Sequence, residues 1–250
     1  MSEERGRDVE EPLTGGFVNE VVRVGGTVRR TVPERAEFTH ALLAHFERAG
    51  WRGAPRVLGR DERGREVLEY LPGRAACTPE ERRAARTDEA LAEVATLVRE
   101  FHDLTAGTAL AGAGEVVCHH DLSPKNTVYA EGWRPVALID WDIAAPGERI
   151  QDLAHVAWQY LELGPDAGEP DEVGRRLRLL CEAYGPTADR ARLLETVLWW
   201  QDRCWRGIEA GAERGEPAMA RLVAAEVPAG IRAASAWVVE HRPALARALG

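Results

Sequence analysis

The stretch VVCHHDLSPKNTVY, residues 116–129, places two histidines, one aspartate, one lysine and one asparagine between two runs of strand-like sequence. Pro124 and the flanking β-prone residues predict a loop here, because proline interrupts a helix. Histidines beside a carboxylate are typical of a metal site or an acid/base pair. An aspartate followed five residues later by an asparagine is typical of a phosphoryl-transfer loop. The rest of the sequence decides between the two interpretations.

A second aspartate, Asp140, ends the apolar segment VALID, residues 136–140. Transfer of a γ-phosphoryl group needs a carboxylate that orients the attacking hydroxyl and accepts its proton, and oxygen ligands that hold Mg²⁺ on the nucleotide phosphates. Asp121 supplies such a carboxylate, and Asn126 and Asp140 supply hard oxygen ligands. The 14-residue separation of Asn126 and Asp140 suits a tight β-ribbon that returns the second aspartate to the first loop. The two loops together predict phosphoryl transfer.

The pattern of His119, Asp121, Asn126 and Asp140, followed by Asp152 in QDLA, resembles the aminoglycoside phosphotransferase family, relatives of choline kinases and of protein kinases. The resemblance covers nearly the whole chain. It implies a small-molecule kinase that uses Mg²⁺ and transfers the γ-phosphoryl group of ATP or GTP to a hydroxyl of an aminoglycoside-like or other small acceptor. Antibiotic resistance is one function that follows from such an activity.

Strand and helix signals predict an α+β, protein-kinase-like fold with two lobes. Residues 1–12 are charged, and we expect a mobile tail there. Residues 13–71 predict an N-lobe with a small antiparallel sheet, because β-branched runs and glycine turns flank a single helical stripe after Pro33. Residues 72–250 predict a mainly helical C-lobe that carries both loops and the acceptor site.

The resemblance implies a role for each matching residue of the two loops. Asp121 is expected to be the catalytic base, and His119 the histidine that braces its loop. Asn126 and Asp140 are expected to ligate Mg²⁺. His120 stands where the family commonly has glycine, and this substitution leaves its role open.

The nucleotide is expected to bind between the lobes. Gly15 and Gly16 would form the turn that covers the phosphates. Glu69, Tyr70 and Leu71 resemble the hinge, whose backbone groups pair with the purine edge whatever the side chains are. The N-lobe has no full glycine-rich loop of the protein-kinase type, which leaves the choice between ATP and GTP open.

Arg30 holds the third-strand position at which these kinases place a basic residue on the α- and β-phosphates. Lys125 is the only lysine in the chain, so an arginine takes this position. The resemblance implies a helix carboxylate as the partner of Arg30, and Glu34 and Glu37 both fit. Lys125 either touches phosphate or is solvated.

Two other functions stay open. The same fold could bind a nucleotide as a regulatory module without turnover. Alternatively, His119 and His120, with His102 and an aspartate, could ligate the metal of a phosphohydrolase, although a loop suits that site less well than a helix. We interpret His102 as a buried structural histidine, and Asp152 as a helix cap that ties down the catalytic loop.

The net charge of −9 and the pI near 5.4 argue against nucleic acid as a partner and favour a cationic small-molecule acceptor. On a helix, Asp202, Trp205 and Glu209 share one face, which either forms an acidic, aromatic wall for an amine or belongs to the core and the solvated surface. No segment approaches the roughly 20 apolar residues of a membrane span, and the N-terminus lacks an apolar leader. We therefore expect a cytoplasmic protein without a membrane partner.

Overall fold

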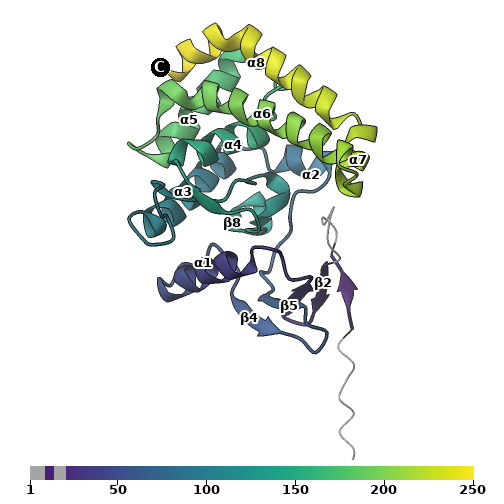
Figure 1. The fold of residues 1–250 in the computed structure, drawn as a ribbon. Helices are drawn as coiled ribbons and strands as arrows, with labels where there is room; N and C mark the ends of the chain where they lie inside the picture. Colours follow the sequence, from purple (N-terminus) through teal and green to yellow (C-terminus); the bar gives the residue numbers. More distant parts are fainter. Residues whose placement is uncertain (1–8, 14–20) are drawn as a thin grey trace, which may run out of the picture.

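The computed structural model describes residues 9–13 and 21–250 of the 250-residue chain. The predicted phosphate-covering turn at Gly15 and Gly16 lies outside these residues. Figure 1 shows a small lobe of strands with one helix and a larger, mainly helical lobe. This arrangement confirms the predicted α+β architecture with two lobes.

The small lobe is built on an antiparallel sheet with the strand order β1-β2-β3-β5-β4. The strands are β1 (Glu11–Pro12), β2 (Val21–Val24), β3 (Thr27–Arg30), β4 (Val57–Arg60) and β5 (Glu66–Glu69). The β3–β5 register places Arg30 directly opposite Glu66. Because β1 pairs with β2, the prediction of a tail through residue 12 was wrong for Glu11 and Pro12, which form the edge strand of the sheet.

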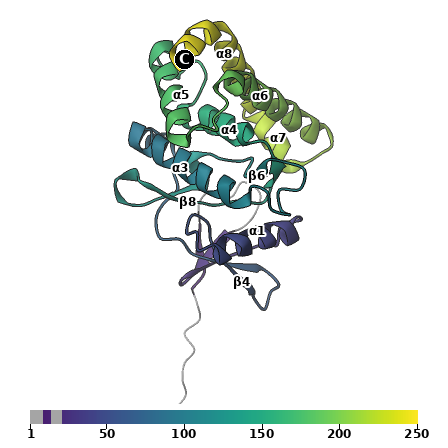
Figure 2. The same ribbon diagram turned by 90° about the vertical axis from the view of Figure 1, so that its left-hand side faces the viewer.

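Helix α1 (Ala36–Arg48) lies between β4 and the larger lobe, as Figures 1 and 2 show from two sides. Its apolar stripe includes Leu42, Leu43 and Phe46, all at most 1% exposed. Such a stripe stabilises a helix by burial. Gly50 follows the helix with φ of 74°, a left-handed conformation that glycine adopts without strain.

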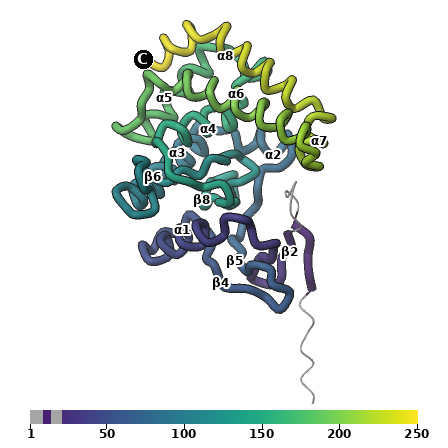
Figure 3. The backbone as a smooth tube through the Cα atoms, viewed as in Figure 1, coloured from purple at the N-terminus to yellow at the C-terminus, as the bar shows by residue number. Residues whose placement is uncertain are grey.

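The larger lobe is a stack of helices. They are α2 (Pro79–Ala84), α3 (Asp88–Thr105), α4 (Arg149–Leu161), α5 (Pro170–Tyr184), α6 (Arg190–Glu213), α7 (Pro217–Ala224) and α8 (Val227–Leu249). The Thr87 hydroxyl caps α3 by accepting from the Ala90 amide at 3.0 Å. Figure 3 shows α8 lying along α5 and α6 at the end of the molecule away from the sheet. Among the described helices none alone is long and apolar enough to cross a membrane, although α7 and α8 together, bent by 62°, meet those criteria.

Two short β-ribbons carry the loops between the lobes. Strand β7 (Thr127–Tyr129) pairs with β8 (Pro135–Leu138), and this confirms the predicted ribbon from Asn126 to Asp140. Strand β6 (Val116–Cys118) pairs with β9 (Ala145–Gly147). The segment between β6 and β7 is a loop with a single short turn at Pro124–Asn126, as the proline predicted.

One hydrophobic core runs through both lobes. Phe46 of α1 packs against Trp141 of the C-lobe, with ring centroids 5.2 Å apart, and Phe101 of α3 lies 5.0 Å from the same indole. Trp141 is 1% exposed and its indole N–H donates to the carbonyl of Leu138 at 3.0 Å. The residue between Asp140 and Asp142 is therefore anchored in the core, and it fixes the loop that carries the two aspartates.

Candidate active site

His119 braces the catalytic loop from below. Its Nε2–H donates to the carbonyl of Ile139 at 3.0 Å, and its Nδ1 accepts from the amide of Asp121 at 3.2 Å. The ring is buried and lies 4.5 Å from that of Trp141. The first bond ties the loop of Asp121 to the strand end that leads to Asp140, so His119 fixes the two predicted site residues relative to each other.

Asp152, in the first turn of α4, holds the same loop from the other side. It is fully buried and accepts from the amides of His119 at 2.7 Å and His120 at 2.9 Å, and from His102 Nε2 at 3.1 Å. This confirms that Asp152 ties down the loop. The predicted cap was wrong, because Glu148 is the N-cap residue of α4 and forms a capping box with Gln151.

His120 adopts φ of 66°, in the left-handed region that glycine enters without strain, which is consistent with the glycine expected here from the resemblance. The turn allows two successive amides to point at one carboxylate, that of Asp152. The imidazole packs against Trp200 with ring centroids 5.5 Å apart and borders a cavity of about 390 Å³. The cavity beside the loop gives the side chain space, and His120 Nε2 donates to Oε1 of Gln151 at 3.4 Å.

Asp121 faces the other lobe and is held by Asn126. The amide nitrogen of Asn126 donates to the backbone carbonyl and to Oδ2 of Asp121, both at 2.8 Å, and Lys125 Nζ lies 3.7 Å from the same Oδ2. Because these bonds use the amide nitrogen, the Oδ1 of Asn126 is the atom that a metal would take. Oδ1 of Asp121 has no hydrogen-bond partner among the residues that the structure describes, and about a third of the side chain (32%) is exposed.

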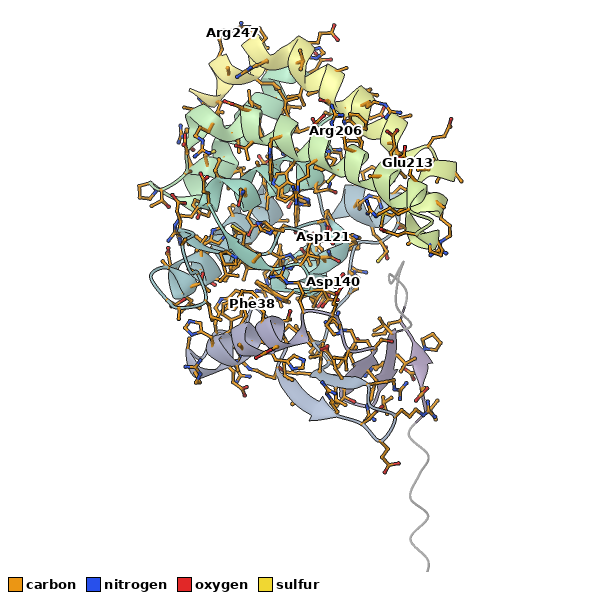
Figure 4. All side chains as sticks on the ribbon, in the orientation of Figure 1. Phe38, Asp121, Asp140, Arg206, Glu213 and Arg247 are labelled. Carbon is orange, nitrogen blue, oxygen red and sulfur yellow. The ribbon has the colours of Figure 1, made fainter. Side chains whose placement is uncertain are left out.

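Asp140 and Asp142 lie on either side of the buried Trp141. Arg30 Nη2 lies 2.6 Å from Asp142 Oδ1, and Arg30 Nη1 lies 3.1 Å from Asp142 Oδ2 and 3.4 Å from Asp140 Oδ1. Figure 4 shows Asp121 and Asp140 on the side of the helical lobe that faces the sheet. The structure thus brings Arg30, Asp121, Asn126 and Asp140 together between the lobes.

The carboxylate that pairs with Arg30 was predicted incorrectly. Glu34 and Glu37 are both exposed. Arg30 pairs instead with the two aspartates of the C-lobe and with Glu66 of β5, at 3.5 Å. The helix position fails because Glu37 lies on the solvent side of α1, whereas Glu66 faces Arg30 across the β3–β5 ladder.

The charges in this cluster suit a divalent cation. Three carboxylates, from Glu66, Asp140 and Asp142, surround the guanidinium of Arg30. Their formal negative charge exceeds the positive charge of Arg30 by two. Burial raises the pKa of Asp142, and the neighbouring Asp140 adds to that effect, against the opposing effect of Arg30. The donors in the two loops are hard carboxylate and amide oxygens, which are the ligands that Mg²⁺ prefers.

Asp142 was missed by the sequence analysis, although the sequence contains a signal for it. In IDWD, a second acid follows Asp140 by two residues across one large apolar residue, close enough in sequence to share the same loop. Glu66 had no comparable signal, because it is one of several charged residues around a turn and its burial depends on the sheet.

The hinge residues were predicted to present backbone groups to the purine. The Glu69 amide donates to the Arg56 carbonyl at 2.9 Å, and the Tyr70 amide donates to the Gly26 carbonyl at 3.0 Å. The amide of Leu71 has no acceptor among the described residues. Leu71 is therefore the member of the predicted hinge whose N–H is available to a base.

The histidines predicted for a metal-dependent phosphohydrolase do not form an open metal site. His102, Cys118 and Asp152 have ligand atoms within 4.8 Å of one another, but all three residues are buried. His102 accepts from the Tyr184 hydroxyl at 2.8 Å and donates to Asp152, so both of its nitrogens are occupied, as are those of His119. The interpretation of His102 as a buried structural residue is confirmed.

The acidic, aromatic face of α6 is covered by arginines. Arg206 pairs with Asp202 at 2.8 Å, and Arg232 pairs with Glu209 at 2.6 Å. Both guanidinium groups lie near the ring of Trp205, 4.3 Å and 5.0 Å from its centroid. A cationic acceptor would have to displace two intramolecular cations here, so this face is not the open amine site that the spacing allowed.

Acidification is expected to lower the free energy of unfolding from about pH 6.5 downward. Burial lowers the pKa of His102 and of His155, so both are neutral in the fold, whereas the unfolded chain protonates them near pH 6.5. Because the unfolded state then binds more protons than the folded state, the free energy of unfolding decreases as the pH decreases. Burial alone would raise the pKa of Asp152, but the hydrogen bond from His102 holds it at about 2, which adds a further loss between about pH 4 and pH 2.

Urea unfolding at about pH 7.5 and about pH 5.5 measures the histidine part of this effect. His102→Gln is the control, because it removes one of the two titrations and should reduce the difference. Equal stability of the wild-type protein at the two pH values would contradict the prediction.

Comparisons with known proteins agree with this geometry. Residues 108–195 match the sequence profile described as "Phosphotransferase enzyme family". The trifolitoxin immunity protein of Rhizobium leguminosarum bv. trifolii is 32% identical over 196 residues, which cover 69% of this chain and 73% of that protein.

Solved structures share the fold at low identity. A choline/ethanolamine kinase family protein from Mesorhizobium loti aligns with a TM-score of 0.60 at 18% identity over 92% of each chain. An ethanolamine kinase from Plasmodium vivax has a TM-score of 0.63 at 12% identity, covering 89% of this chain and 83% of its own. An aminoglycoside phosphotransferase from Streptomyces rimosus, solved with ADP and streptomycin, has a TM-score of 0.55 at 18% identity, covering 77% and 92%.

These likenesses confirm the kinase-like fold with two lobes. The profile covers the segment that contains both loops, from before His119 to beyond Asp152. Together with the identity to the Rhizobium protein, they show that the chain belongs to the phosphotransferase enzyme family.

Proposed function

We propose that the protein is a small-molecule kinase that transfers the γ-phosphoryl group of ATP or GTP to a hydroxyl of a small acceptor. The observation that carries this proposal is the convergence of Asp121, Asn126 and Asp140 between the lobes, with Asn126 hydrogen-bonded to Asp121. A base and two hard oxygen ligands in adjacent loops are what phosphoryl transfer requires.

Asp121 acts on the acceptor hydroxyl. Its Oδ2 is held by the Asn126 amide, so its Oδ1 orients the hydroxyl and accepts the proton as the new phosphate ester forms. The oxygens of Asn126 and Asp140 would hold Mg²⁺, and Asp142 lies beside them. When bound, Mg²⁺ supplies charge neutralisation on the nucleotide phosphates.

Arg30 of β3 is the residue of the small lobe that we assign to binding of the nucleotide phosphates. Burial acts to lower the pKa of Arg30, but the carboxylates of Asp142 and Glu66 raise this pKa by more than burial lowers it, so the guanidinium stays charged. Without nucleotide, Arg30 pairs with the aspartates of the metal loop. We infer that phosphate oxygens replace these carboxylates when the nucleotide binds, because they are the same kind of bidentate acceptor.

The acceptor is proposed to be an aminoglycoside or another hydroxylated, cationic small molecule. The support is the fold shared with the streptomycin-bound enzyme of Streptomyces rimosus and the net charge of −9. A second candidate comes from the Rhizobium relative, whose name is that of an immunity protein. In this second candidate function, the protein phosphorylates a toxin and thereby protects the cell that makes the protein.

A coupled assay of ADP or GDP release tests both candidates. The protein is incubated with Mg²⁺, ATP or GTP, and a panel of aminoglycosides, other hydroxylated antibiotics and toxins, choline, ethanolamine and simple sugars. Release that depends on one acceptor and is lost in Asp121→Ala is the expected result. Nucleotide binding without transfer to any member of the panel would favour a regulatory module without turnover.

A further inference from the structure

Glu66 on β5 is a buried carboxylate without a hydrogen bond. The residue is 0% exposed, and neither carboxylate oxygen has a hydrogen-bond partner among the described residues. The nearest side-chain nitrogens in the ion-pair geometry are Arg30 Nη2, 3.5 Å from Oε1, and His40 Nε2, 3.6 Å from Oε2. Since burying a charge is costly unless it is paired, stability alone does not explain an acid at this position.

The sheet fixes Glu66 relative to Arg30. The two residues are direct partners in the antiparallel β3–β5 ladder, so their side chains leave the same face of the sheet. Changing this pairing would require a shift of strand register, and a one-residue shift would turn all side chains of the strand to the opposite face. The pair is therefore a permanent part of the small lobe.

The other partners of Arg30 belong to the opposite lobe. Asp140 and Asp142 sit in the loop after β8, and Asp140 is also a proposed Mg²⁺ ligand. In the proposed complex, Asp140 would ligate Mg²⁺, and phosphate oxygens would replace Asp140 and Asp142 as the partners of Arg30. Glu66 is then the only carboxylate that still holds the guanidinium among those that contact it here.

We propose that Glu66 is the positioning residue of Arg30: it holds the guanidinium toward the cleft when the nucleotide phosphates take the place of Asp140 and Asp142. His40 of α1 is the other neighbour of Glu66, with its Nε2 3.6 Å from the second carboxylate oxygen, beyond hydrogen-bond distance. The inference rests on the proposed function, since it assigns Arg30 to the nucleotide phosphates.

The test is calorimetric titration with Mg-ATP and Mg-GTP in the absence of any acceptor. Glu66→Gln keeps the shape of the side chain and removes its charge, and it should raise the dissociation constant about tenfold, the loss of one charge-assisted pair. Glu62→Gln, an exposed acid in the turn before β5, is the matched control and should bind like the wild type.

A double-mutant cycle separates positioning from mere structure. If Glu66 acts through Arg30, then adding Glu66→Gln to Arg30→Gln should weaken binding no further. Equal effects of Glu66→Gln in the two backgrounds would overturn the inference, and so would a Glu37→Gln variant that weakens binding as much as Glu66→Gln does. If Glu66→Gln fails to fold, His40→Gln takes its place in the cycle, with an expected loss of about threefold that requires Arg30.

Failure of the inference and failure of the proposed function give different results. Wild-type binding of a Mg-nucleotide with unchanged binding by Glu66→Gln rejects the role of Glu66 alone. Absence of Mg-ATP and Mg-GTP binding by the wild-type protein rejects the kinase proposal, and the role of Glu66 with it.

Discussion

Replacing Asp121 with alanine is expected to lower acceptor-dependent turnover by about 10²- to 10⁴-fold, the usual contribution of a positioned base. The dissociation constant of the Mg-nucleotide should stay near that of the wild type. The reason is geometric: Asp121 is held by Asn126, whereas Arg30 pairs with Asp140 and Asp142 rather than with Asp121. Steady-state kinetics and calorimetry on the same preparation measure the two quantities.

Asp121→Asn is the sharper variant. It keeps an oxygen that accepts the hydrogen bond from Asn126 but removes the proton acceptor, so it should be nearly as inactive as the alanine variant. Full activity of either variant would reject Asp121 as the base. A large loss of Mg-nucleotide binding would instead place Asp121 in the metal site.

Replacing Trp141 with alanine is expected to lower the free energy of unfolding by about 3–5 kcal/mol, the usual cost of deleting a buried tryptophan. Trp141 is 1% exposed and packs against Phe46, Phe101 and His119, so the cavity would open where both lobes and the catalytic loop meet. The change should also weaken Mg-nucleotide binding, because Asp140 and Asp142 lose the anchor between them.

Urea unfolding measures this loss, with Trp199→Ala as the matched control. Trp199 is 44% exposed, so its removal should cost less than about 1 kcal/mol. Similar stabilities of the two variants would show that the aromatic contacts of Trp141 contribute little. Trp141→Phe, which keeps a ring in the core, should recover part of the lost stability.

The local features of the site were predictable. Asp121 and Asn126 are only five residues apart in the sequence, and the β7–β8 ribbon needs only a short turn between two strands. Contacts of this kind arise within a few residues, so their spacing is read directly from the sequence. The brace by His119 and the tie to Asp152 followed from the family pattern.

Contacts between distant segments were not predictable. The pairing of Arg30 with Glu66 depends on how β3 and β5 align across an intervening helix and strand, and its pairing with Asp142 depends on how the lobes meet. On α6, the cover of Asp202 by Arg206 follows from an i,i+4 spacing, but Arg232 reaches Glu209 from another helix. Helical periodicity defines a face without showing what covers it.

The core that runs through both lobes decides what can be separated in this protein. Leu42, Leu43 and Phe46 of α1 are buried among side chains of the C-lobe, so cutting the chain at the hinge would expose apolar surface on both fragments. The two lobes contribute different groups to the site, but they share one core, so we expect the whole chain to fold as one unit. We therefore expect denaturation in a single cooperative transition, and a transplanted catalytic lobe would need α1 to accompany it.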